Sequence, residues 1–317
     1  MSTEPTRRSS SGGTRPGPGT RTQRTAATVA AGILSGVSFK IAVSTYSFNR
    51  FGYGSEGTDW PGFEGIFDTC ADLGIDGVEL LGVHVQDGVD LHRLKATAAR
   101  YGIAFVSVSA NHNFVQPDPA KRTAEIDTVA GWVDAAHEVG APFVRAFGGR
   151  WNTRQWHDFM EHRGEEPPLP GHTEDEGYAW SVEAFKIAGY YAGRKGIALA
   201  VENHWGLTGT AEGVLRILRE TGSPWLRVAL DTGNFPYVAD PYQEMARLAP
   251  HAAMVHAKTY FGGGLHYSFD TDFKRVGRIL ADAGFRGYVS IEHEGKALPA
   301  EAIRRSVDLL REAFAGL

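Results

Sequence analysis

Short apolar runs rich in β-branched residues alternate with amphipathic segments along most of the chain. Runs of this length, bounded by glycine, proline and polar residues, are typical of strands buried in a parallel sheet. Eight such strands are expected, at residues 39–48, 76–82, 103–110, 142–149, 197–203, 226–234, 252–260 and 287–295.

The segments between the expected strands have the apolar spacing of helices that bury one face. They include residues 90–102, 124–140 and 299–317, and the last of these opens with Pro299, a residue suited to a first helical turn. Glycine follows several of them, as in "YGIAF" and "VGAPF". Glycine readily ends a helix in the left-handed conformation, so these positions mark the expected ends of helices.

This alternation of strands and helices predicts an α/β fold, a single (β/α)₈ TIM barrel, over residues 39–317. The alternative is an open, doubly wound sheet, which would carry a glycine-rich phosphate loop after its first strand. The sequence at that place, "STYSFNRFGYG", is aromatic and does not match such a loop. The barrel is therefore the favoured fold.

Residues 1–38 are rich in serine, glycine, proline and arginine and are expected to form a disordered basic tail. Residues 1–39 contain five arginines and one glutamate and therefore carry a charge of +4. Because the net charge of the whole chain is −5, the remaining residues carry −9. An acidic body argues against nucleic acid as a partner, because neutralisation of phosphates dominates that kind of binding. Residues 25–39 follow basic residues and are uncharged, so an export signal is the alternative to the expected cytoplasmic location.

The composition fits a globular protein with a full-sized core, with 42% hydrophobic and 22% charged residues. The single cysteine, Cys70, excludes an internal disulfide and a cysteine-based zinc site. No stretch of the sequence is long and apolar enough to span a membrane, so no membrane partner is expected.

Ionisable residues gather where the last four expected strands end, in the segments "VENHWG", "LDTGN", "VHAK" and "IEHEG". The carboxyl ends of the strands of a barrel meet on one face, where TIM barrels carry their active sites. We therefore expect these side chains to line one rim. They are Glu202, His204, Asp231, His256, Lys258, Glu292 and Glu294, together with the amide of Asn234. His293 alternates with Glu292 along its strand and is expected to point to the opposite face, where it packs or supports the site.

Several buried charges at one rim would be costly without a counter-charge, and a divalent cation removes that cost. Glu202, Asp231, His256 and Glu292 offer three carboxylates and one imidazole. This oxygen-rich set suits Mn²⁺ best and Mg²⁺ as well, with Co²⁺ as a possible substitute. Each residue alone would equally serve as a salt-bridge or capping partner, but their occurrence on four consecutive strands favours a metal site.

Other residues near strand ends are candidates for contact with a substrate. Arg145 either clamps an anionic substrate or pairs with a neighbouring acid, and Glu79 either bonds to the substrate or is a buried structural acid. Trp151 is one of several aromatic residues that either stack on a sugar or simply pack. The polar segment 150–177, between the fourth strand and its helix, is typical of a lid or binding loop, although a surface loop without function is the alternative.

The four segments at these spacings resemble the xylose-isomerase-like barrel superfamily, in particular its group of sugar phosphate isomerases and epimerases. That group includes ketose 3-epimerases, hydroxypyruvate isomerase and inosose dehydratase. The resemblance covers residues 39–317 and implies a metal held by Glu202, Asp231, His256 and Glu292, with Glu202 and Glu292 also moving protons on the two faces of the substrate. Asn234 stands where the ketose epimerases tend to have a histidine, and an amide cannot titrate in its place.

The resemblance and the expected ligand set indicate a metal-dependent isomerase or epimerase that acts on a keto-sugar or a polyol-derived ketone through an enediolate. The expected catalytic residues are Glu202, Glu292, His204 and Lys258. The expected substrate-binding residues are Glu79, Arg145, Trp151 and Asn234.

Three alternatives to this function stay open. The first is a lyase on the same site, either an inosose-type dehydratase or an enzyme that eliminates the aglycone of a 3-keto-glycoside, including a C-glycoside. The second is an apurinic-site endonuclease, which would need about three zinc ions and more histidines. The third is a non-catalytic partner subunit. The expected ligand is a small sugar or glycoside, and a homo-oligomer or a second subunit is compatible with the sequence.

Overall fold

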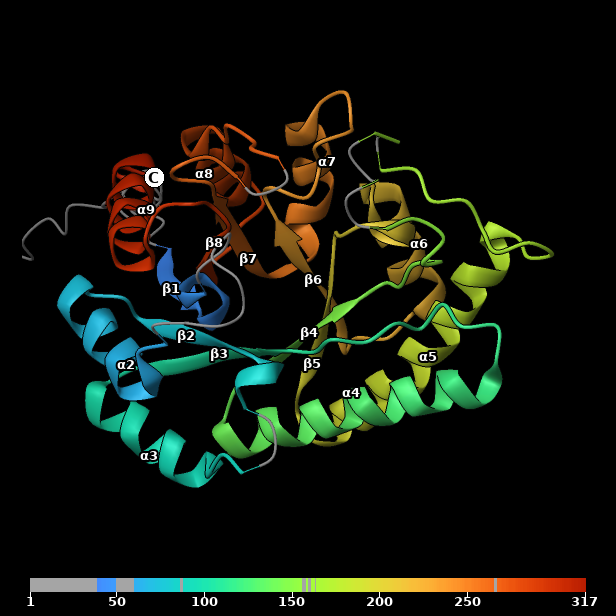
Figure 1. Cartoon of the computed structure of the whole chain (residues 1–317), viewed down its shortest axis with the longest axis horizontal. Helices are drawn as coiled ribbons and strands as arrows, with labels where there is room; N and C mark the ends of the chain where they lie inside the picture. Colours follow the sequence, from blue (N-terminus) through green and yellow to red (C-terminus); the bar gives the residue numbers. More distant parts are fainter. Residues whose placement is uncertain are drawn as a thin grey trace, which may run out of the picture. The chain divides into compact units, whose positions relative to one another are not determined.

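Eight parallel strands close into a barrel in the order in which they occur along the chain, and β8 pairs with β1 (Figure 1). The predicted (β/α)₈ barrel is confirmed. The strands are β1 (Lys40–Ser44), β2 (Gly77–Leu81), β3 (Ala104–Ser109), β4 (Phe143–Phe147), β5 (Ala198–Glu202), β6 (Leu226–Asp231), β7 (Ala252–Thr259) and β8 (Tyr288–His293).

The structure, a computed structural model, describes residues 39–49, 60–85, 88–155, 158, 161–162, 164–264 and 267–317. The segment from Val37 to Leu317 forms one compact unit. The predicted disordered tail, residues 1–38, lies outside the described residues.

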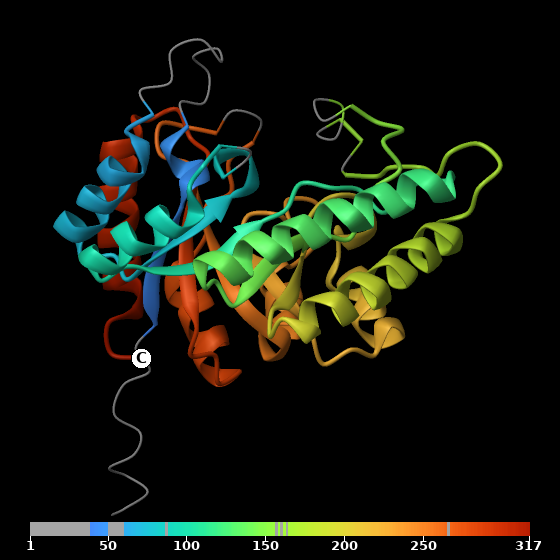
Figure 2. The same ribbon diagram turned by 90° about the horizontal axis from the view of Figure 1, so that it is seen from below.

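Helices form an outer ring around the strands (Figure 1). They are α2 (Gly62–Leu73), α3 (Leu91–Tyr101), α4 (Pro119–Val139), α5 (Glu174–Arg194), α6 (Ala211–Thr221), α7 (Pro241–Leu248), α8 (Phe273–Asp282) and α9 (Pro299–Phe314). Short 3₁₀ turns are η1 (Thr45–Phe48), η2 (Gly82–His84), η4 (Gly206–Thr208) and η5 (Ala249–His251). In the side view of Figure 2, the C-terminus that follows α9 lies at the end of the barrel where the strands begin. No described helix has the length and apolar character that crossing a bilayer requires.

Local capping explains where the elements differ from the predicted bounds. The first strand stops at Ser44, whose hydroxyl accepts a hydrogen bond from the Tyr46 N–H and starts η1. Helix α4 begins before residue 124 because the Asp118 carboxylate caps it, ahead of a proline in the first turn. Helix α5 begins inside the segment predicted as loop 150–177, where Thr173 and Glu176 form a capping box.

The alternation of side chains along each strand decides which residues face the interior of the barrel. Ala200, Ala229 and Met254 form a small buried cluster that is separate from the main hydrophobic core. Glu202, Asp231 and His256 each lie two residues further along the same strands and therefore face the same interior, nearer to its carboxyl end. Two alanines and a methionine thus pack in the barrel interior beneath a layer of ionisable side chains.

Cys70, the chain's one cysteine, is fully buried on α2 within the main core. Burial raises the pKa of its thiol to about 12. We expect Cys70 in the folded protein to react with Ellman's reagent about 10³-fold more slowly than a free thiol at pH 8, since the thiolate is the reactive form. Guanidinium should expose one reactive thiol per chain. Rapid labelling without denaturant would contradict the buried position.

Candidate metal centre

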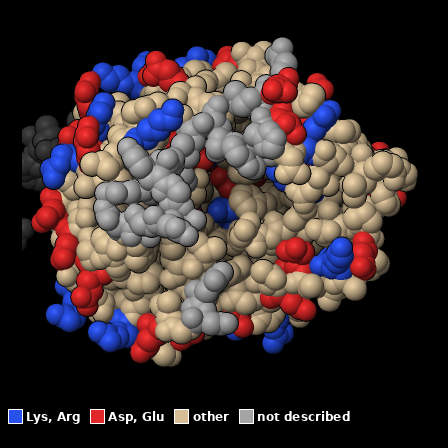
Figure 3. Space-filling view, viewed as in Figure 1, with Lys and Arg blue, Asp and Glu red and all other residues tan. Residues whose placement is uncertain are grey.

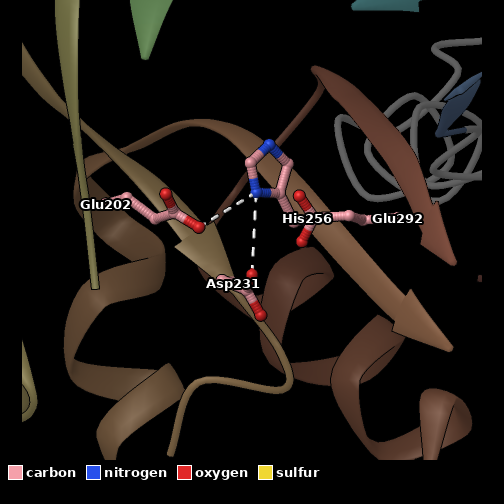
Figure 4. A group of neighbouring side chains, drawn as sticks. All are labelled: Glu202, Asp231, His256 and Glu292. Carbon is pink, nitrogen blue, oxygen red and sulfur yellow. Dashed lines mark hydrogen bonds and ion pairs between the residues drawn. The ribbon is translucent and has the colours of Figure 1, made fainter. Parts of the chain in front are cut away.

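The carboxyl ends of β5, β6, β7 and β8 bring four ligand-type side chains together. Glu202, Asp231, His256 and Glu292 each offer one nitrogen or oxygen atom, and these atoms all lie within 4.8 Å of one another (Figure 4). All four residues are buried, with Glu292 the most exposed at 8%. The face of the barrel above them is hollowed at its centre, and both acidic and basic atoms are visible inside the hollow (Figure 3).

Hydrogen bonds with Asn203, the residue after β5, and with Gly233 fix the position of Asp231. The side chain of Asn203 donates to the Asp231 carbonyl at 2.9 Å and accepts from the Asp231 N–H at 2.8 Å. The Asp231 carboxylate accepts from the Gly233 N–H at 2.7 Å. A Cβ atom at Gly233 would lie 2.5 Å from the Tyr260 hydroxyl and 2.7 Å from the Lys258 side chain, so only glycine fits this turn. These contacts explain the "VEN" and "LDTG" segments.

His256 is held between the cluster and Glu79. Its Nδ1 lies 3.3 Å from Glu202 Oε1 and 3.7 Å from Asp231 Oδ2, while its Nε2 lies 3.0 Å from Glu79 Oε2. Glu79 also accepts hydrogen bonds from Ser109 and, at 2.9 Å, from Ser290. A proton on Nε2 shared with Glu79 leaves the Nδ1 lone pair directed at the cluster, which is the arrangement of a metal-binding histidine. The structure thus places Glu79, predicted as a substrate ligand, behind His256.

Burial and neighbouring charges shift the pKa values of Glu202 and Glu292 in opposite directions. Burial alone would raise the pKa of Glu202, but the Arg145 guanidinium, whose Nε lies 3.3 Å from Glu202 Oε2, and His256 together outweigh burial and lower that pKa. Burial and the carboxylates of Asp231 and Glu202 raise the pKa of Glu292 to about 7, against the opposing charges of Lys258 and His256. One carboxylate is therefore held ionised while another is able to carry a proton near neutral pH.

Lys258 places its ammonium among the acids. Its Nζ lies 3.1 Å from Asp231 Oδ2, 3.1 Å from Glu292 Oε2 and 3.7 Å from Glu294 Oε2. Burial alone would lower the pKa of Lys258, but the nearby carboxylates, Asp231 foremost, raise it well above its usual value. Lys258 also donates to Asn234 Oδ1 at 3.0 Å. It is therefore a permanent counter-charge within the cluster.

Asn234 and two tyrosines extend this network. Asn234 donates to Glu202 Oε1 at 3.3 Å and accepts from the Tyr267 hydroxyl at 3.2 Å. The Tyr46 hydroxyl donates to Glu294 at 3.0 Å. The position of Glu294 near the cluster could be predicted from the sequence, because Glu294 lies two residues after Glu292 and alternation places both on one face of the strand. The position of Tyr267 could not be predicted, because it depends on the path of a loop.

The residues of the cluster fit a divalent cation. Asp231 Oδ2 and Glu292 Oε2 are buried without a hydrogen-bond donor of good geometry, and the Lys258 ammonium is the cation that faces both. Three carboxylates and a histidine nitrogen form a donor set typical of Mn²⁺, Mg²⁺ and related ions. The sequence-predicted ligands are therefore assembled in one place, with two buried carboxylate oxygens that share the single Lys258 ammonium.

Two cavities flank Trp205 beside the cluster. The first, of about 520 Å³, is bordered by Asn234 and by Trp151, which is 3% exposed and packs on Trp180. The second, of about 510 Å³, is bordered by His204, whose ring centroid lies 4.6 Å from that of Phe147. Trp205 belongs to both walls. Trp151 and His204, which were predicted as separate site residues, thus border different cavities.

The segment between β4 and α5 is organised around one buried carboxylate. Glu166, whose side chain is 1% exposed, lies 3.0 Å from the Arg150 guanidinium and accepts from the N–H groups of Trp151 at 2.9 Å and Thr153 at 3.1 Å. Glu166 also borders the first cavity. This part of the predicted 150–177 loop is therefore a wall of that cavity.

The protein is therefore a parallel α/β barrel with a candidate metal centre at the carboxyl ends of its strands. Three carboxylates and one histidine make up that centre. A scan against protein families matches residues 67–313 to the family described as xylose isomerase-like TIM barrel. The chain belongs to this family, as the resemblance of its motifs implied. A sequence search of curated proteins gives no match.

Solved structures include several of the same fold. The 3-keto-D-glucoside 4-epimerase YcjR from E. coli is 17% identical, with a TM-score of 0.68 over 87% of this chain and 100% of that chain. An L-ribulose 3-epimerase is 18% identical, with a TM-score of 0.68 over 87% and 96%. The IolI protein with a bound zinc atom is 16% identical, with a TM-score of 0.68 over 87% and 100%. At these identities the likeness shows the fold alone.

The contact between Glu79 and His256 gives a prediction about metal affinity. Replacing Glu79 with glutamine should weaken binding of Mn²⁺ by about 10–100-fold, because the carboxylate no longer fixes the His256 tautomer. Isothermal titration calorimetry measures the affinity, and Glu183→Gln, on the exposed surface of α5, is the matched control. Equal affinities of the Glu79 variant and the unmodified protein would refute this positioning role.

Proposed function

We propose that the protein is a divalent-metal-dependent isomerase or epimerase that acts on a keto-sugar or a polyol-derived ketone through an enediolate. One observation carries the proposal: Glu202 and Glu292 lie on opposite sides of His256 in a shared buried cluster (Figure 4). In the proposed complex, one of these carboxylates faces each side of the substrate, as the family resemblance implied. Solved relatives in fold that are described as sugar epimerases support the same reaction class.

Glu202, Asp231, His256 and Glu292 would hold the metal. Mn²⁺ is the proposed ion because oxygen ligands dominate the set, and Mg²⁺ and Co²⁺ are the alternatives. When bound, a divalent cation supplies a Lewis acid that stabilises negative charge on neighbouring substrate oxygens. The zinc atom in the IolI structure supports metal binding by this fold.

The two glutamates have the proton-transfer properties that the reaction needs. The ion pair with Arg145 keeps Glu202 ionised, as suits a base that removes the proton α to a carbonyl. Glu292, with its pKa raised to about 7, is able to hold a proton and return it. Return to the same carbon on the other face gives the epimer, and return to the neighbouring carbon gives the isomer.

Two further residues are proposed to move the hydroxyl proton of the substrate. The Lys258 ammonium is buried beside Glu292 and is a donor to a developing alkoxide. Burial lowers the pKa of His204 to about 4, so its ring is neutral and is able to relay a proton. Arg145 pairs with Glu202 and donates to the Ala110 carbonyl. Its proposed role is to keep the Glu202 carboxylate ionised.

The size of the first cavity favours a lyase as the second candidate. A space of about 520 Å³ that adjoins Asn234 has room for a substituent on the reacting sugar. If that substituent is β to the carbonyl, its departure from the enediolate gives an elimination. Such a reaction is an inosose-type dehydration or the release of the aglycone from a 3-keto-glycoside, including a C-glycoside.

Hydrogen exchange in D₂O tests the proposed function. The protein with Mn²⁺ is incubated with ketoses, inososes and 3-keto-glycosides, the Mn²⁺ is removed by chelation, and the products are followed by NMR. Deuterium α to the carbonyl in an intact carbon skeleton is the expected result, and the labelled carbon distinguishes epimerisation from isomerisation. Loss of water or of an aglycone would favour the lyase. No exchange and no elimination on any member of the panel would overturn both candidates.

A further inference from the structure

Apart from His204, the residues that line the second cavity, beside Trp205, have no part in the reaction proposed above. Its volume of about 510 Å³ lies within the range of about 300–1,000 Å³ that is typical of small-molecule sites. Amides, imidazoles and aromatic rings make up most of its wall. They include Asn111, His112, Gln116, Phe147, Asn152 and Trp205.

The cavity adjoins the Glu202 side of the cluster. The Phe147 ring that borders it lies under the Arg145 guanidinium, at 4.1 Å from the ring centroid, and Arg145 pairs with Glu202 at 3.3 Å. His204, two residues after Glu202, forms another part of the wall. The four ligand-type residues do not line the cavity themselves, but residues in contact with Glu202 or close to it in sequence do.

His112 is a buried polar residue of this wall, with the main-chain carbonyls of Phe147 and Ala110 near its ring. It is 7% exposed, and neither ring nitrogen has a hydrogen-bond partner of good geometry among the described residues. Burial and the charge of Arg145 lower the pKa of His112 to about 3, although the main-chain carbonyls of Phe147 and Ala110 act against them. The ring is therefore neutral, with one donor and one acceptor nitrogen. Unpaired buried polar groups are rare in proteins and call for an explanation.

The charged groups of the wall are already engaged within the protein. Arg150 pairs with Glu166 at 3.0 Å, and Glu125 accepts from the Asn113 N–H at 3.1 Å. The cavity thus offers amides, a neutral imidazole, the faces of aromatic rings and the remaining acceptor positions of the Glu125 carboxylate. Hydroxyl groups of an uncharged sugar match these donors and acceptors, and the apolar faces of a sugar ring match Phe147 and Trp205.

We propose that the second cavity is a subsite for an uncharged sugar ring that is linked to the sugar facing the carboxylates, with His112 bonded to one of its hydroxyls. The substrate is then a glycoside of at least disaccharide size, since a monosaccharide at the cluster would leave this cavity empty. The inference rests on the proposed function, because that function places the reacting sugar at the carboxylates.

The test uses the full chain with Mg²⁺ and three disaccharides as probes: cellobiose, maltose and gentiobiose. Their affinities are compared with that of methyl β-D-glucoside by NMR titration. The ring C–H signal of His112, assigned by its absence in His112→Gln, reports where the second ring lies. Three variants are compared: His112→Leu removes the polar atoms, His112→Gln keeps a donor and an acceptor, and His137→Leu, on the exposed surface of α4, is the control.

At least one disaccharide is expected to shift the His112 signal and to bind more tightly than methyl β-D-glucoside. His112→Leu should weaken that disaccharide about fivefold, the loss of a typical hydrogen bond, while His112→Gln and His137→Leu change its affinity by less than about twofold. An unchanged His112 signal, or unchanged affinity in His112→Leu, would overturn the subsite. If exchange in D₂O occurs on a ketose in that case, the proposed function stands without the subsite. If no exchange occurs either, both fall.

Discussion

Deuterium exchange into the substrate is expected to slow by about 10²–10⁴-fold when Glu292 is replaced with glutamine, the usual contribution of a positioned acid or base. Glutamine keeps the size of the side chain and one oxygen ligand, but it neither takes up nor releases a proton at neutral pH. Glu292 is the carboxylate of the cluster whose pKa is raised to about 7. The rate is measured by NMR in D₂O at saturating Mn²⁺.

Two controls separate lost proton transfer from lost metal. Metal content is measured in the purified variant, because Glu292 belongs to the proposed ligand set. Glu312→Gln, on α9, changes a side chain that is 75% exposed and should leave the rate unchanged. A Glu292→Gln protein that holds metal and exchanges deuterium at the normal rate would remove Glu292 from the proton-transfer step.

The barrel and its ligand set could be predicted from the sequence because both depend on short-range patterns. Apolar runs place the strands, and alternation along a strand decides which residues face inward. In a closed parallel barrel, every inward-facing residue at the carboxyl end of a strand lies at the same rim, independently of the conformation of the loops. Asp231 and His256, paired directly across β6 and β7, follow from that rule.

Side-chain contacts between residues far apart in the sequence could not be predicted in the same way. Glu79 and His256 are 177 residues apart, and Tyr46 and Glu294 are 248 residues apart. Whether such side chains meet depends on strand register and rotamers, which no local pattern encodes. The missing partner of His112 likewise follows from the packing of three strand ends, so the second cavity had no sequence signal.

The charges around the cluster explain why it suits a divalent cation. Five carboxylates, of Glu79, Glu202, Asp231, Glu292 and Glu294, face two permanent cations, Arg145 and Lys258, together with His256. In the protein without metal, burial and the surplus of carboxylates raise the pKa of Glu292 to about 7. The carboxylates also raise the pKa of His256 well above its usual value, although burial alone would lower it. Protons and a divalent cation thus compete for the same negative charge.

Replacing Lys258 with methionine should therefore make folding strongly dependent on metal. Without metal, the variant loses the cation that faces Asp231 and Glu292 at 3.1 Å, and the free energy of unfolding should fall by about 3–5 kcal/mol. Added Mn²⁺ supplies positive charge to the same oxygens, so it should stabilise the variant more than the unmodified protein. Denaturation by guanidinium with EDTA and with excess Mn²⁺ measures both effects.

Lys195→Met is the matched control, because Lys195 also pairs with a carboxylate, that of Asp134, at 2.9 Å. That pair is at the surface, with side chains 30% and 52% exposed, and its loss should cost about 1 kcal/mol or less with or without Mn²⁺. If Lys258→Met lost the same free energy in EDTA as in excess Mn²⁺, the lysine would be a packing element. A loss confined to the metal-free protein would instead show that Lys258 and the metal neutralise the same carboxylates.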